Sequence, residues 1–255
     1  KEAARREIFA ALEIWRDNKA FIDESQAWLN DEDQKSAVNS LDHTANDSKC
    51  MHKLAGQGKR LTGTCFDMLS PTMRGPLLVV IPDQASSRGA FAIGKFEVTV
   101  GDFNAYCKDT QACDVEMDTK NNFPKSNVSI SQITNYLDWL STKTGERYRL
   151  PSVSEWEYAA HANGNQPRRD VNCRVVQEGE IVMGNAVEQS DRGKANGWGI
   201  YNDLGNVQEL ATDGEELFAL GGSFTDDIQQ CTIKFRLQHL GVPEQITGFR
   251  VLKEF

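Results

Sequence analysis

The chain has 255 residues, enough for one large domain with an added segment or for two small domains, and its 39% hydrophobic and 25% charged residues are typical of a globular protein. Its formal net charge of -9 argues against a nucleic-acid or anionic-membrane partner, because no basic stripe is available to neutralise phosphates. It has no run of roughly 18 apolar residues, so we expect no membrane insertion within this sequence.

Residues 1–73 are predicted to form a helical stalk or hairpin followed by a linker. Over residues 1–30, apolar residues such as Leu12 and Trp15 recur near helical spacing between charged ones, which predicts an amphipathic helix. From Asn30 to about Gly63 the sequence becomes polar, which indicates a linker or a second helix. Because Lys1 is not a methionine, we expect a longer or processed protein upstream.

A domain is predicted over residues 74–255. The apolar run at 76–82 favours a buried strand, and alternation over 91–99 favours another. Helices are predicted at 100–110, from Ser129 to Gly145, and from Ser152 to about Gly164, because each follows a helix-capping residue with a polar partner three positions on. The remaining residues are rich in Gly, Asn and Asp, which indicates short strands joined by long loops.

The six cysteines form an even set that we pair as Cys50 with Cys65, Cys107 with Cys113, and Cys173 with Cys231. The first two pairs are close in sequence, so each would close a small loop at low entropic cost. Disulfides indicate a periplasmic or extracellular location. The alternative is a set of buried, reduced thiols in a cytosolic protein.

Four motifs carry a resemblance to a known family. They are Arg-Leu-Pro-Ser-Val-Ser-Glu-Trp-Glu-Tyr-Ala-Ala at 149–160, the Gly-rich stretch at 197–210, Gly-Gly-Ser-Phe at 221–224 and Gly-Phe-Arg-Val at 248–251. Together they resemble the formylglycine-generating enzyme (sulfatase-modifying factor) family. The resemblance covers roughly residues 74–255 and implies an α+β, C-type-lectin-like fold with a loop-rich C-terminal half.

The resemblance also shows a departure at the catalytic position. The family's oxidase uses two closely spaced cysteines that bind copper upstream of Gly-Phe-Arg, whereas this sequence has Cys231 alone, with Phe235 where the second would fall. One thiolate is a poor copper(I) site. The four histidines lack metal-binding spacing. We therefore expect neither copper nor iron, and we do not expect an enzyme of the family type.

Calcium is the metal that the resemblance leaves open. The family's Gly-Asn-Val-Trp-Glu-Trp loop holds a structural calcium ion, which implies Gly205, Val207 and Glu209 as ligands here. Gln208 and Leu210 replace the two tryptophans. Backbone and carboxylate oxygens suit a hard cation. The alternative is a purely structural loop.

We interpret the protein as a non-catalytic ectodomain that binds or senses an unknown protein or small-molecule ligand. By analogy with the family, it would be the extracytoplasmic part of a bacterial membrane Ser/Thr kinase. The alternatives are a metabolite-tailoring oxidase with an altered metal site, and a display scaffold with variable loops. The predicted binding surface lies over the incomplete catalytic site and comprises Phe224, Thr225, Asp226, Gln238 and His239.

Overall fold

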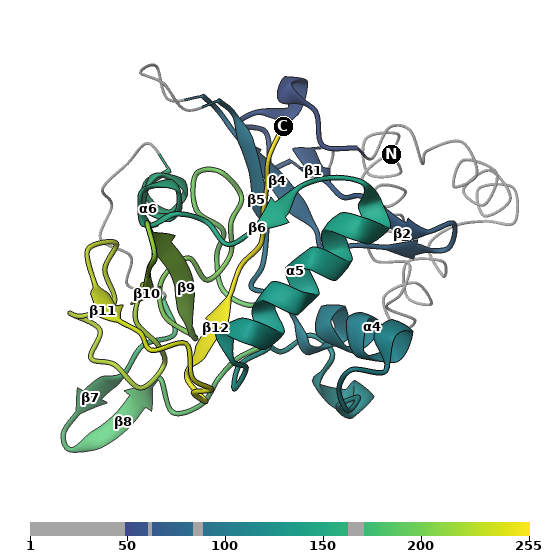
Figure 1. The fold of residues 1–255 in the computed structure, drawn as a ribbon. Coiled ribbons are helices and arrows are strands. Elements are labelled where there is room, and N and C mark those ends of the chain that lie inside the picture. The colour runs from purple at the N-terminus through teal and green to yellow at the C-terminus, as the bar shows by residue number, and fades with distance from the viewer. Residues whose placement is uncertain (1–48, 61–62, 84–88, 163–170) are drawn as a thin grey trace, which may run out of the picture.

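The computed structural model describes residues 49–60, 63–83, 89–162 and 171–255. The helix predicted over residues 1–30, and the linker as far as residue 48, lie outside these ranges. The described part mixes helices with short strands, which confirms the predicted α+β class (Figure 1). Within it, no helix is long and apolar enough to cross a bilayer.

A five-stranded sheet forms the centre of the domain. Its strands are β1 (Thr64–Cys65), β4 (Leu78–Ile81), β5 (Phe91–Gly94), β13 (Leu252–Lys253) and β6 (Tyr148–Arg149), in that order. All four pairings are antiparallel. Strand β4 confirms the strand predicted within 76–82, whereas β5 stops at Gly94, well short of residue 99. Strand β1 belongs to this sheet although it lies in the segment predicted to precede the domain.

Both faces of this sheet are covered. Successive side chains of a strand point to opposite faces, and β4 shows this directly. Leu78 and Val80 belong to a core that also contains Tyr136, while Val79 and Ile81 belong to a second core that includes Trp198. The absence of a solvent-exposed face explains why β4 is apolar at every position.

The three α-helices in the described ranges begin where the sequence predicts. They are α4 (Val100–Thr110), α5 (Ile130–Thr144) and α6 (Val153–His161), and each starts with a complete capping box. Helix α5 ends at Gly145, whose φ of 72° is left-handed, as expected for a glycine that terminates a helix. Helix α6 ends at His161 rather than near residue 164, and residues 163–170 lie outside the described part.

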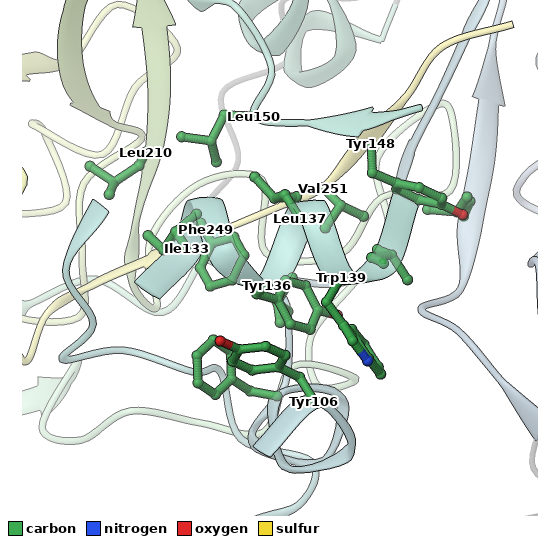
Figure 2. Close-up of a cluster of buried hydrophobic side chains, with 14 of the residues drawn as sticks. Tyr106, Ile133, Tyr136, Leu137, Trp139, Tyr148, Leu150, Leu210, Phe249 and Val251 are labelled. Atoms are coloured by element: carbon green, nitrogen blue, oxygen red, sulfur yellow. The ribbon is translucent and has the colours of Figure 1, made fainter. Parts of the chain in front are cut away.

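The main core lies against the inner face of α5 (Figure 2). Tyr136 is its centre: its ring lies 5.4 Å from that of Phe103 on α4 and 5.7 Å from that of Phe249. Aromatic pairs at such distances stabilise a core beyond simple burial of area. The residues labelled in the figure are Tyr106, Ile133, Tyr136, Leu137, Trp139, Tyr148, Leu150, Leu210, Phe249 and Val251.

The C-terminal half is rich in loops, as predicted, and carries a second sheet. Its order is β11 (Arg236–Gln238), β10 (Glu216–Leu220), β9 (Gln208–Asp213) and β12 (Thr247–Phe249). Only the pairing of β12 with β9 is parallel. Two hairpins lie apart from the sheets: β2 (Met68–Ser70) with β3 (Met73–Arg74), and β7 (Val175–Gln177) with β8 (Glu180–Met183). Short 3-10 helices span His52–Leu54 and Asp118–Lys120.

All three predicted cysteine pairs are disulfides in the structure. Cys50 bonds Cys65, Cys107 bonds Cys113, and Cys173 bonds Cys231. The first ties residue 50 to strand β1, and the second closes the end of α4. The described residues contain no free cysteine.

Candidate functional site

The first three predicted surface residues follow a tight turn after β10. Gly221 and Gly222 both have a positive φ, and a Cβ on Gly222 would lie 2.8 Å from the Cys231 sulfur. The turn leads into Phe224 and Thr225, which are half-buried. Asp226 does not extend into solvent. Its Oδ2 accepts hydrogen bonds from the Ser223 amide at 2.8 Å and the Ser223 hydroxyl at 2.7 Å, so it stabilises the turn.

The other two predicted residues come from β11 and the loop after it. Gln238 is exposed and donates to the Glu216 carboxylate at 3.2 Å. His239 is only 8% exposed, so the prediction that it contributes to an exposed surface is wrong. Its Nδ1 accepts from the Gly241 amide at 2.9 Å. The buried ring thus stabilises the loop that follows β11 through this hydrogen bond.

A chain of polar side chains links Asp226 to His239. Gln208 donates to Asp226 at 3.1 Å, and the Thr247 hydroxyl lies 3.5 Å from the Gln208 carbonyl oxygen. Thr247 also donates to Glu244 at 3.2 Å, and Glu244 lies 3.6 Å from His239 Nε2. The structure thus connects two of the five predicted residues through three that were not predicted as site residues. The only sequence signal for them was Gln208, a polar residue in a tryptophan position of the motif.

Cys231 is buried and bonded to Cys173 at an S–S distance of 2.03 Å. Phe235, at the place assigned to a second cysteine, is half-buried, and its backbone oxygen accepts from the Gly221 amide. The carboxylates and imidazoles offer no alternative centre: the described residues contain no group of three or more His, Cys, Asp or Glu that could hold a metal ion.

Residues 56–255 match the family model described as the sulfatase-modifying factor enzyme 1-like (FGE-sulfatase) domain. The chain belongs to this family. The match begins ahead of the boundary predicted at residue 74, and it includes the segment that carries β1. A comparison with curated protein sequences found no match.

Solved structures share the fold of this sulfatase-modifying factor domain. PvdO from Pseudomonas aeruginosa is 21% identical, with a TM-score of 0.61 over 74% of this chain and 98% of its own. Treponema denticola variable protein 1 is 17% identical, with a TM-score of 0.54 over 69% and 95%. CarF is 20% identical, with a TM-score of 0.53 over 66% and 87%. These likenesses establish the architecture.

The loop expected from the sulfatase-modifying factor family to bind calcium is tightly packed. Gly205 has a φ of 76°, and a Cβ there would lie 2.5 Å from the Cys173 sulfur. Glu209 accepts hydrogen bonds from Arg250 Nε at 2.9 Å and Trp156 Nε1 at 2.7 Å, and Arg250 Nη2 binds its other oxygen. A carboxylate already paired with a buried guanidinium does not fit a calcium ligand. Calcium at Gly205, Val207 and Glu209 therefore stays a prediction from the resemblance, without support from the position of Glu209.

A second buried carboxylate lies beside this ion pair. Glu97 is fully buried, and its Oε1 accepts from the Asn206 side chain at 2.8 Å. Burial raises the pKa of Glu97 from 4.5 to about 7, and the Glu209 carboxylate adds to the rise while the Arg250 charge opposes it. Asn206 is one of the motif residues, so the motif builds a buried polar network around Arg250.

Replacing Glu97 with Gln should remove part of the pH dependence of stability. Because the folded pKa is raised, protonation of Glu97 stabilises the fold fully below pH 4.5, and that stability is lost as the pH rises to about 7. The shift corresponds to about 3 kcal/mol. Between about pH 5 and pH 8, the melting temperature of the wild type should fall more steeply than that of Glu97→Gln.

The matched control is Glu155→Gln. The pKa of Glu155 is lowered to about 2, chiefly because hydrogen bonds from Arg149 and Ser152 outweigh its burial. Its contribution is lost only as the pH falls below the ordinary value of 4.5. This variant should be less stable than the wild type throughout the window with an unchanged slope. Equal slopes for wild type and Glu97→Gln would show that Glu97 is already ionised at pH 5.

Proposed function

We propose that this domain is a non-catalytic, ligand- or partner-binding member of its family, and that it senses its ligand in an oxidising compartment. The observation that carries the proposal is the buried bond between Cys173 and Cys231. A copper(I) centre of the family type requires thiolates as ligands. With both sulfurs in a disulfide and Phe235 nearby, the described residues offer no pair of thiolates at this place.

The surface around β11 supports a binding role. Leu240 is 87% exposed, and Leu237 and Val242 are about half exposed beside Gln238. Exposed apolar side chains gathered on one part of a surface are typical of sites that bind partners. The half-buried Phe224 adds an aromatic group at the other end of the polar chain through Gln208. Since His239 and Asp226 hold their loops in shape, they act as supports for this surface rather than as contacts.

The oxidising compartment is supported by the three disulfides, which persist outside the cytosol. Attachment to a membrane Ser/Thr kinase rests on the family analogy alone. A sensing role requires that the described domain bind a ligand. It also requires that ligand binding change the conformation or contacts of the residues that precede the domain.

Incubation of the oxidised protein with a cysteine-containing sulfatase peptide, copper and oxygen should yield no formylglycine, as measured by mass spectrometry of the peptide. The physical reason is the absence of a paired thiolate site. An active formylglycine-generating enzyme assayed in parallel is the positive control. Turnover by this protein that disappears in Cys231→Ser would overturn the proposal, because it would show that the disulfide opens to give a working thiol.

A further inference from the structure

A cleft remains that the proposed function does not use. It lies between the β2–β3 hairpin, the beginning of α4 and the segment 118–122, and it has a volume of about 430 Å³. Figure 1 shows β2 and α4 at the same side of the molecule, away from β11. We call it the α4 cleft, defined by Leu69, Met73, Arg74, Pro76, Thr99, Gly101, Asp102, Ala105, Asp118, Thr119, Asn121, Asn122, Tyr136 and Gln189.

A small inner pocket adjoins the α4 cleft. Its volume is about 60 Å³, and it shares Arg74, Thr99, Asp102 and Asn122 with the cleft. It adds Ser190 and Asp191, among others, to the lining. The combined volume lies in the range of small-molecule sites, roughly 300–1,000 Å³.

Four residues that line these two spaces each have a buried polar atom without a hydrogen-bond partner among the described residues. These atoms are the Tyr136 hydroxyl, Arg74 Nε, the Ser190 hydroxyl and Asp191 Oδ1. Tyr136 is 0% exposed and Ser190 is 1% exposed. Buried polar groups in native proteins are nearly always paired, since an unpaired one costs about 1–3 kcal/mol. Because all four residues line these adjoining spaces, a bound ligand is a natural partner for their unpaired atoms.

The Tyr136 hydroxyl is protonated in this environment. Burial raises the pKa of Tyr136 well above 10, and the charge of Asp102, which lines both spaces, raises it further. Together with Arg74 Nε, it offers hydrogen-bond donors to a ligand, whereas Asp191 Oδ1 offers only an acceptor.

The charges and the unpaired atoms select one ligand chemistry. Asp102, Asp118 and Asp191 outnumber Arg74, so an anionic group such as a phosphate is disfavoured. An ammonium group has no acceptor lone pair, so it leaves the donors of Tyr136 and Arg74 unpaired. A hydroxyl group both donates and accepts, so several hydroxyl groups on one molecule can together pair with all four atoms. The amides of Asn121, Asn122 and Gln189 add further polar partners for hydroxyls.

We propose that the α4 cleft binds a neutral polyhydroxylated small molecule, with its hydroxyl groups paired to Tyr136, Arg74, Ser190 and Asp191. The cleft shares no lining residue with the predicted binding surface, which comprises Phe224, Thr225, Asp226, Gln238 and His239. Ligand binding in the α4 cleft therefore does not depend on whether the domain is non-catalytic.

The test is a titration of the full chain, labelled with ¹⁵N, with glucose and myo-inositol at concentrations up to about 50 mM. Glucose 6-phosphate and ethanolamine serve as anionic and cationic probes. We expect at least one neutral polyol to shift the amide signals of Ser190 and Asp191, with weaker binding of the two charged probes. Tyr136→Phe, which removes only the unpaired hydroxyl, should weaken binding about fivefold without lowering the melting temperature.

Tyr106→Phe is the matched control, because Tyr106 packs against Tyr136 but does not line the cleft. It should bind the polyol like the wild type. If Tyr136→Phe does not fold, Ser190→Ala gives the same test from the inner pocket. The proposal is overturned if no neutral polyol shifts these signals, if the phosphate ester binds as well as glucose, or if Ser190→Ala and Tyr136→Phe both bind like the wild type. The first outcome would mean that solvent alone pairs with the four atoms.

Discussion

Replacing Glu209 with Ala should lower the free energy of unfolding by about 3–5 kcal/mol, because it leaves the buried guanidinium of Arg250 without the carboxylate that is hydrogen-bonded to it. Both side chains are 1% exposed. The other hydrogen bonds of Arg250 go to two backbone oxygens, of Gly94 at 2.8 Å and Tyr201 at 2.9 Å, which carry no full charge. The charges of Glu97 and Asp203 also act on Arg250, but less strongly than that of Glu209. The replacement also removes the acceptor of Trp156. Chemical denaturation at neutral pH measures the change.

A surface pair provides the control for this measurement. Glu157 pairs with Lys234 at 2.8 Å, and the Lys234 side chain is 80% exposed. Glu157→Ala should cost less than about 1 kcal/mol, as is usual for solvent-exposed pairs. The double variant Glu209→Leu with Arg250→Met should recover much of the loss, because it removes both buried charges. A loss below 1 kcal/mol for Glu209→Ala would show that water reaches Arg250.

The second large effect is expected from the Cys173–Cys231 disulfide. Replacing both cysteines with Ala should lower the free energy of unfolding by about 4 kcal/mol, because the bond closes a loop with a sequence separation of 58. The same replacement of Cys107 and Cys113, separated by 6, should cost only about 2 kcal/mol. Denaturation of the two variants under identical conditions makes the comparison.

An equal or reversed order of these two losses would contradict the entropic account. It would mean that packing around the sulfurs matters more than loop length. Tight packing around the Cys173–Cys231 sulfurs is the physical basis for that alternative, since Gly205 lies close to the Cys173 sulfur and Gly222 to the Cys231 sulfur.

Local signals in the sequence predicted the helices because those signals act locally. The capping boxes at Thr99, Ser129 and Ser152 fix each helix start through contacts within four residues. The buried strand at 78–81 and the two cysteine pairs that are close in sequence were predicted from local signals too, and Cys173 with Cys231 was the pair that remained. The family motifs predicted the loop-rich half, whose sheets depend on pairings that no local pattern reveals.

The site residues were harder to predict because their roles depend on distant partners. His239 was expected at the surface, but its ring packs into the loop that begins with it. Glu209 was expected to bind a cation, but Arg250, 41 positions away, lies against it. Tyr136 belongs to the apolar face of α5 by spacing, and only the fold shows that its hydroxyl lines a cavity.

The strand order determines when the two sheets can form during folding. Strand β13 lies between β5 and β6, and β12 borders β9, so residues 247–253 complete both sheets. A nascent chain that still lacks this segment has β6 detached from β5 and no parallel partner for β9. Neither sheet can close before residues 247–253 have been synthesised. We therefore expect slow folding that waits for this segment, as is typical of proteins dominated by non-local pairings.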